Sequence, residues 1–221
     1  MVGLLVGILA LSVGGVVGAL VNNAQIKTST TTSTTAPTTT LPPVSNLGDV
    51  GKELGNLAAA GRLATYTAVY SSNDPELPAG LVQTLDLWRK GADHFRSDVV
   101  QRAGDSLTID SNVIKGDLVK ACKTVDGKRT CQTLQGQALD LPGLFIKKIV
   151  TATSPPKLTV RSDAVSGYEA RCFDATGIGE LCLAGDGSML RIILNGPKGP
   201  ATVALTRITS DVPDSAFDLA D

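Results

Sequence analysis

Apolar and polar residues alternate along most of the chain after about residue 60, with the two-residue period of half-buried β-strands. In ATYTAVYS, for example, Ala64, Tyr66, Ala68 and Tyr70 fall on one face and the threonines on the other. Turn signals such as Gly-Asp, Lys-Gly and Asp-Gly separate these segments. The predicted strands cover residues 64–71, 80–90, 93–100, 106–114, 117–125, 128–134, 157–161, 165–173, 180–185, 188–194 and 201–209. Helices do not alternate with these strands, so the pattern predicts an antiparallel sheet.

Two segments have a helical pattern and can cover such a sheet. The first spans residues 48–60, is rich in alanine and is predicted to end at Gly61, and the second spans residues 141–153. An antiparallel sheet of about ten strands exceeds the comfortable size of a flat open sheet, so it must curl strongly. The predicted fold class is mainly β (α+β): a strongly curved antiparallel meander sheet, or half-barrel, covered by one or two helices.

The second helical segment carries an apolar face that suits the closure of a cavity. Phe145 pairs with Ile149, and Ile146 with Val150, at helical i, i+4 spacing. We predict that these four residues form the lid and lining of a ligand cavity. Small side chains on the inner face of the sheet would leave space beneath the lid or, equally, let a helix pack closely. The alanines concerned are Ala64, Ala68, Ala170 and Ala184.

The stretch ACKTVDGKRTC places two cysteines around an Asp-Gly turn. If residues 126–127 form a type I′ turn, then Val125 lies opposite Lys128 and Cys122 lies opposite Cys131. Counted outward from the turn, the two cysteines form a non-hydrogen-bonded pair, whose close spacing suits a disulfide. The sequence therefore predicts a Cys122–Cys131 cross-strand disulfide.

The stretch RCFDATGIGELC repeats this arrangement, because Cys172 and Cys182 are equidistant from Gly177. A three-residue loop, or a five-residue loop bounded by Asp174 and Glu180, sets the two cysteines opposite each other. Each predicted disulfide closes a loop of about ten residues, which the chain-entropy model values at roughly 2.5 to 3 kcal/mol. The alternative for all four cysteines is a set of buried, reduced thiols.

The N-terminal residues predict attachment to a membrane. Residues 2–21 contain no charge and no proline, and about twenty apolar residues are enough for a helix to span a bilayer. We therefore expect a transmembrane signal anchor over residues 1–24. A signal peptide cleaved after Ala19 is the alternative, because the residues before that position are small.

The Thr-, Ser- and Pro-rich residues 25–45 have too few apolar groups to fold and are predicted to form a stalk. Residues 46–221 are long enough to form one domain with a core of its own. Because disulfides form in oxidising compartments, this domain is expected outside the cytoplasm. The expected location is the cell membrane, with a single span, or the exterior if the N-terminal segment is cleaved.

Composition and motifs favour a binding function over a catalytic one. The net charge is −1 with dispersed Lys and Arg, which does not favour a nucleic-acid partner. The chain contains no G-x-S-x-G, GxGxxG or P-loop motif, and the single histidine, His94, is predicted on a solvated strand face. The cysteine spacings do not fit zinc. We expect no catalytic residue, no metal and no cofactor.

Three stretches carry a resemblance to a known family: VSGYEARCF (165–173), ELCLAGDGSMLRI (180–192) and ITSDVPDSAF (208–217). With the meander and the two helices, they resemble the LolA-like envelope proteins, and among these the actinobacterial lipid-binding lipoproteins of the LppX and LprG type. The resemblance implies a curved sheet closed by helices around an apolar cavity for acyl chains, used to carry lipids or lipoproteins. This chain departs from the family because it lacks the lipidation cysteine and has two hairpin disulfides.

Two hypotheses about function follow. In the first, a membrane-anchored extracytoplasmic domain binds a lipid or another apolar ligand in a half-barrel cavity, without catalysis. In the second, a stalked and disulfide-stiffened surface domain with a filled core binds a protein or glycan partner whose identity the sequence does not indicate. A cavity beneath the second helix distinguishes the first hypothesis from the second.

Overall fold

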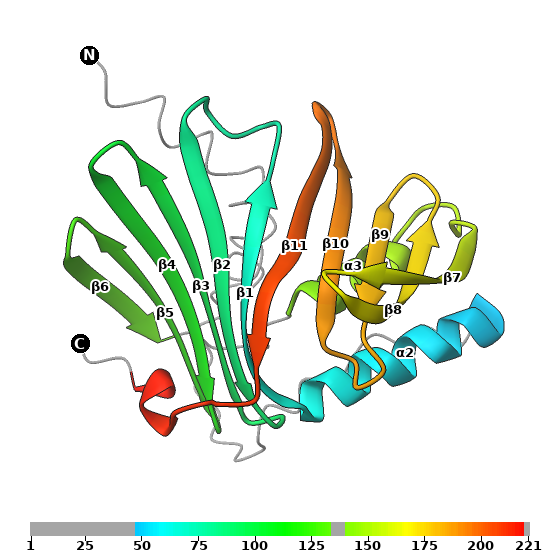
Figure 1. Ribbon diagram of the computed structural model, residues 1–221, viewed down its shortest axis with the longest axis horizontal. Coiled ribbons are helices and arrows are strands. Elements are labelled where there is room, and N and C mark those ends of the chain that lie inside the picture. Colours follow the sequence, from blue (N-terminus) through cyan, green and yellow to red (C-terminus); the bar gives the residue numbers. More distant parts are fainter. Residues whose placement is uncertain (1–46, 134–139, 219–221) are drawn as a thin grey trace, which may run out of the picture.

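The computed structural model describes residues 47–133 and 140–218 (Figure 1). The helices are α2 (Gly48–Leu63), α3 (Leu141–Val150) and the short 3₁₀ helix η3 (Asp214–Phe217). The strands are β1 (Thr65–Asn73), β2 (Leu81–Lys90), β3 (His94–Ala103), β4 (Ser106–Lys115), β5 (Leu118–Val125), β6 (Lys128–Thr133), β7 (Leu158–Val165), β8 (Tyr168–Ala175), β9 (Gly179–Leu183), β10 (Met189–Gly196) and β11 (Gly199–Thr209). The predicted mainly β class, with a curved antiparallel sheet and two covering helices, is confirmed.

All eleven strands belong to one sheet, in the order β6-β5-β4-β3-β2-β1-β11-β10-β9-β8-β7. Every neighbouring pair is antiparallel. The sheet is built from two meanders, β1–β6 and β7–β11, which are joined where β11 pairs with β1. Because β6 and β7 lie at opposite ends of the order, the sheet is an open half-barrel and not a closed barrel.

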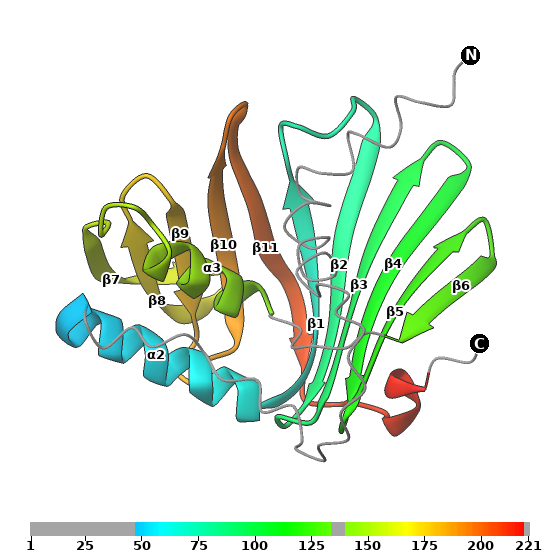
Figure 2. The ribbon, with the colours of Figure 1, turned by 180° about the vertical axis from the view of Figure 1, so that it is seen from behind.

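Within residues 47–133 and 140–218, the two α-helices cover one half of this sheet. Figure 2 shows α3 lying over β9 and β10, while α2 runs across the ends of the same group of strands. The other half, β2–β6, fans out beyond the helices, and η3 contacts β3 and β4 at their lower ends (Figure 1).

Helix α2 continues past the predicted end at Gly61 and stops at Leu63, so that boundary was wrong. Gly61 serves helix packing and not a helix cap. A Cβ added to Gly61 would lie only 2.1 Å from the carbonyl oxygen of Gly187, in the turn between β9 and β10. The absence of a side chain thus allows the helix backbone to touch the sheet.

Helix α3 begins as expected but ends at Val150, three residues before the predicted end. Asp140 caps its first turn, because its carboxylate accepts a hydrogen bond from the Gly143 N–H at 3.0 Å. At the other end, the Thr151 hydroxyl donates to the Lys147 carbonyl at 2.8 Å. Pro155 follows shortly afterwards and disfavours helical geometry in the residue before it.

The predicted strand over residues 165–173 is interrupted by a turn that the sequence reasoning missed. Ser166 and Gly167 both have positive φ, 52° and 84°, and they connect β7 to β8. Two successive positive φ values are typical of a type I′ hairpin turn. The Ser-Gly pair was overlooked because apolar residues flank it on both sides.

Both predicted disulfides are present: Cys122–Cys131 between β5 and β6, and Cys172–Cys182 between β8 and β9. In the first hairpin Val125 pairs with Lys128, as the type I′ turn requires. In the second, Ala175 pairs with Gly179, which selects the three-residue loop over the five-residue alternative. Local turn chemistry therefore brought each cysteine pair into register.

The main core lies between the helices and strands β1–β3 and β7–β11 of the sheet. Its fully buried residues come from α2, α3, β1–β3 and β7–β11, and include Leu54, Tyr70, Phe145 and Phe173. Within the described chain, strands β4–β6 (residues 106–133, here called the wing) supply none of these fully buried core residues. The wing therefore extends away from the core.

The helices of the described stretches, 47–133 and 140–218, are too short or too polar to cross a bilayer. The predicted transmembrane helix over residues 1–24 and the stalk over residues 25–45 fall outside these stretches, and both stay predictions.

Candidate ligand-binding cavity

A cavity of about 300 Å³ lies on the concave side of the sheet beside α3. Its walls come from β2, β3, β10, β11 and α3, and its remaining border from the β1–β2 connection and the β10–β11 turn. This volume is at the lower end of the range for small-molecule sites. The cavity borders the second helical segment at Leu141 and Lys148.

One wall of the cavity is apolar, because alternate residues of neighbouring strands point to the same side of the sheet. Ile192 pairs with Val203 across β10 and β11, and Leu194 pairs with Ala201. The aliphatic side chains that line the cavity are Leu85, Val99, Leu141, Ile192, Leu194 and Val203. An apolar ligand in contact with this wall would be removed from water.

The opposite end of the cavity is polar and is formed where β1 leaves the sheet. The Ser72 hydroxyl donates to Gln83 Oε1 at 2.9 Å, and both residues line the cavity. Asp74 starts the β1–β2 connection, and its Oδ1 accepts from the Glu76 N–H at 2.9 Å. Asp74 and Gln83 are only 7% and 3% exposed. The cavity is therefore amphipathic, with acidic and amide groups at one end.

The predicted lid residues lie in the core beside the cavity, while other residues of α3 line it. Phe145, Ile146 and Ile149 are almost completely buried, and Val150 packs against the same cluster. The α3 residues that line the cavity are Leu141 and Lys148, two turns apart on one side of the helix. The ligand-binding role of the four predicted residues stays a prediction.

The four alanines proposed for the inner face are not part of the cavity lining. Ala68 and Ala170 are buried in the core, and Ala64 and Ala184 pack against its edge. The cavity-lining residues of the β1–β2 connection and of the β10–β11 turn were missed by sequence reasoning. Loop residues of this kind carry no periodic signal, although Asp74 precedes a proline and so marks a turn.

A buried ionic cluster positions α3 against the sheet and against α2. Asp140 accepts from Arg89 Nη2 at 2.7 Å and lies 3.4 Å from Arg62 Nη2. Burial raises the pKa of the Asp140 carboxyl, but the charges of Arg89 and Arg62 and the Gly143 N–H outweigh it and lower that pKa below its usual value. The Asp140 carboxylate thus links α2, β2 and α3.

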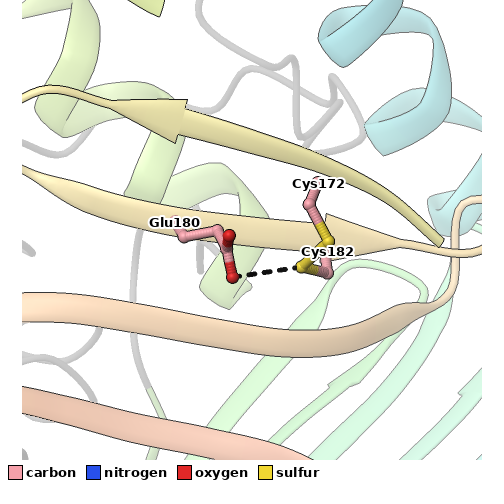
Figure 3. Close-up of side chains that lie close together, drawn as sticks. All are labelled: Cys172, Glu180 and Cys182. Atoms are coloured by element: carbon pink, nitrogen blue, oxygen red, sulfur yellow. Dashed lines mark hydrogen bonds between the residues drawn. A yellow bond between two sulfur atoms is a disulfide. The ribbon is translucent and has the colours of Figure 1, made fainter. Parts of the chain in front are cut away.

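A second charged cluster covers the Cys172–Cys182 disulfide on the convex face. Glu180 accepts from Arg191 Nη2 at 2.7 Å and also pairs with Arg161. Figure 3 shows Cys182 Sγ beside Glu180 Oε1, at 3.3 Å. Although Cys172, Glu180 and Cys182 are close enough to hold a metal ion, both sulfur atoms belong to the disulfide and are not free thiolates.

His94 lies on the opposite strand face from Phe95, as the alternation predicts. It is half-buried and not simply solvated, because its ring packs edge-on against Phe217 of η3, with centroids 5.2 Å apart. On the same face Arg96 stacks on Trp88 and donates to the Ala216 carbonyl. These contacts hold η3 against the sheet.

No protein-family model matches the chain, and a comparison with curated proteins finds no match. Among solved structures, the MucA/MucB complex of Pseudomonas aeruginosa matches with 18% identity and a TM-score of 0.46, over 78% of this chain and 62% of that chain. The chain thus spans less than two thirds of the MucB length.

LprF from Mycobacterium bovis matches with 13% identity and a TM-score of 0.38, over 77% of this chain and 96% of that one. A putative outer membrane lipoprotein-sorting domain from Vibrio parahaemolyticus matches with 6% identity and a TM-score of 0.34, over 77% and 95%. Each of these structures shares less than 20% identity with this chain.

Proposed function

We propose that this domain binds a lipid or another apolar ligand non-covalently in the cavity beside α3. The observation that carries the proposal is the cavity itself, about 300 Å³ with an aliphatic wall beside the packed core. A void that loses the contacts of its lining is costly unless a ligand restores them. Each methylene group buried there would contribute about 0.8 kcal/mol to binding.

The proposal needs no chemical step, because binding follows from removal of apolar surface from water. The alternative, a surface interaction module, assumed a filled core and gains no support from the cavity. The domain would act close to a membrane, held there by the predicted anchor and stalk. The fixed anchor favours local handling or sensing of the ligand over long-distance transport.

The decisive experiment fills the cavity. Ala201 lines it and pairs with Leu194, whereas Ala204 on the same strand pairs with Arg191 and faces the other side of the sheet. Ala201→Trp should reduce the lipid that is retained during purification, and Ala204→Trp should not. Lipid extraction and mass spectrometry measure the retained amount, and circular dichroism confirms that both variants fold. Equal lipid content in wild type, Ala201→Trp and Ala204→Trp would contradict the proposal.

The proposed anchor is tested by the mass of the mature protein isolated from membranes. A mass that includes residues 1–24 supports the signal anchor. A chain that begins at Leu20 supports cleavage after Ala19 and release of the domain.

A further inference from the structure

Two polar atoms of cavity-lining residues are buried and have no hydrogen-bond partner within the described chain. Asp74 uses Oδ1 to accept from the Glu76 N–H, but its Oδ2 is unpaired. Gln83 uses Oε1 to accept from Ser72, but its Nε2 is unpaired. Buried polar groups are almost always satisfied in native proteins, so the unpaired acceptor of Asp74 and the unpaired donor of Gln83 mark this part of the cavity as a site for the polar group of a ligand.

The chemistry of the two atoms restricts the ligand group. The Asp74 oxygen only accepts and the Gln83 nitrogen only donates, and a hydroxyl group is able to donate to the first and accept from the second. A carboxylate or phosphate brings no proton for Asp74 and adds negative charge beside Glu76. An ammonium group accepts nothing, so it leaves Gln83 unpaired. Lys148 also lines the cavity, but it is exposed and water solvates its charge.

The size of the cavity restricts the apolar part of the ligand. A volume of about 300 Å³ is at the lower end of the range for small-molecule sites. One acyl or alkyl chain of moderate length fills it, whereas several chains do not fit. The aliphatic wall and the polar end then receive the two parts of one amphiphilic molecule.

We infer that the cavity selects a single-chain amphiphile with a neutral, hydroxyl-bearing head group, and that Asp74 and Gln83 bind this head group. The inference rests on the proposed function, because it assumes that the cavity takes a ligand. It adds the class of ligand and the two residues that determine head-group specificity.

The test compares three probes that share a ten-carbon chain: 1-decanoylglycerol, decanoic acid and decylamine. Equilibrium dialysis measures their binding to the full-length chain in phospholipid nanodiscs, because the chain has a predicted anchor. Binding to empty nanodiscs is subtracted. We expect 1-decanoylglycerol to bind about five- to tenfold more tightly than either charged probe, which is the factor that one hydrogen bond supplies.

Two variants assign the specificity to the named residues. Gln83→Leu should weaken the binding of 1-decanoylglycerol about five- to tenfold and leave the binding of the charged probes unchanged. Gln101→Leu is the matched control, because Gln101 pairs with Gln83 on the neighbouring strand but is not among the residues that line the cavity. Asp74→Asn keeps an acceptor for the Glu76 N–H but removes a charge, so it should strengthen the binding of decanoic acid.

The outcomes separate this inference from the proposed function. If no probe binds above empty nanodiscs, the proposed function fails, and the inference fails with it. If all three probes bind equally to the wild type, ligand binding stands and the head-group specificity is overturned. An equal loss of binding of all three probes in Gln83→Leu would also overturn it. The polar end would then maintain the shape of the cavity without selecting a head group.

Discussion

In β9 every side chain is buried, whereas in β6 no side chain is buried. Each of these strands contributes one cysteine to a disulfide, Cys182 in β9 and Cys131 in β6, yet the two strands lie in very different surroundings. Strand β9 is covered by α3 on the concave side, and the Glu180 cluster covers its disulfide on the convex side. Strand β6 is the last strand of the wing and has a partner strand on one side only.

The comparison shows that one sheet is stabilised in two ways. The helix-covered half buries apolar side chains on a packed core, and this is where the cavity lies. The wing buries Val113, Val119 and Cys122 outside this core cluster and otherwise relies on backbone hydrogen bonds, cross-strand pairs and the Cys122–Cys131 disulfide. A disulfide contributes most where burial contributes least, as in small domains with little core.

The largest expected effect comes from the cluster that links α2, α3 and β2. Asp140→Asn removes the charge that compensates Arg89 and Arg62, and loss of one partner of a buried ion pair costs about 3–5 kcal/mol. The helix-covered half should lose hydrogen-exchange protection, while the wing retains it. Chemical denaturation measures the total loss.

The same residue gives a pH dependence. Because folding lowers the pKa of Asp140, its contribution to stability is present above the unfolded-state pKa of about 3.9 and is lost as pH falls through the lower folded-state pKa. Below pH 4 the melting temperature of the wild type should therefore fall more steeply than that of Asp140→Asn. Parallel curves for the two proteins would contradict the assignment.

A matched pair of leucines tests the difference in burial directly. Leu181 in β9 is 0% exposed and Leu118 in the wing is 42% exposed. Leu181→Ala should lower the free energy of unfolding by about 2–5 kcal/mol, because it leaves a core cavity. Leu118→Ala should change it by less than about 0.5 kcal/mol. Similar losses in both variants, measured by urea denaturation, would remove the distinction.

Removal of the two disulfides should increase hydrogen exchange in different parts of the sheet. Replacing Cys122 and Cys131 by alanine should cost up to about 2.5 to 3 kcal/mol and increase hydrogen exchange in β5 and β6 only. The same change at Cys172 and Cys182 should spread to β10, because both cysteines are fully buried and Cys182 lies opposite Arg191 of β10. Local effects at both positions would show that the core does not depend on the second disulfide.

The smallest effect is expected at the contact between α2 and the β9–β10 turn. Gly61→Ala forces a Cβ towards the Gly187 carbonyl, and such overpacking costs about 1–3 kcal/mol. Asn56→Ala, exposed on the same helix, is the control and should leave stability unchanged or slightly raised. An equally stable Gly61→Ala would mean that α2 tolerates displacement from the sheet.

Much of the local structure was predictable. The Asp-Gly turn determined the register of β5 and β6, and with it the Cys122–Cys131 pair. The Ser166–Gly167 turn was missed, since serine at positive φ is rare and apolar residues surround it. The end of α2 was misplaced, because glycine in a helix reads as a stop signal whereas here Gly61 permits a close contact.

The candidate site was much less predictable. Sequence periodicity indicated the buried face of α3, with Phe145 and Ile149, but the cavity is lined instead by Leu141 and Lys148. The polar end depends on Asp74, a loop residue outside any periodic pattern. A loop residue is buried when segments distant in the sequence pack over it. A single sequence does not indicate which segments do so.

By itself, the sequence determined most of the strands and turns and both disulfides, because these depend on interactions between residues close together in the chain. Only the tertiary structure decided that β11 returns to pair with β1, and that strands from both meanders enclose one cavity with α3. Such pairings close long loops, and their free energy depends on the packing of the whole sheet. The proposed ligand site is therefore a property of the folded chain and not of any one segment.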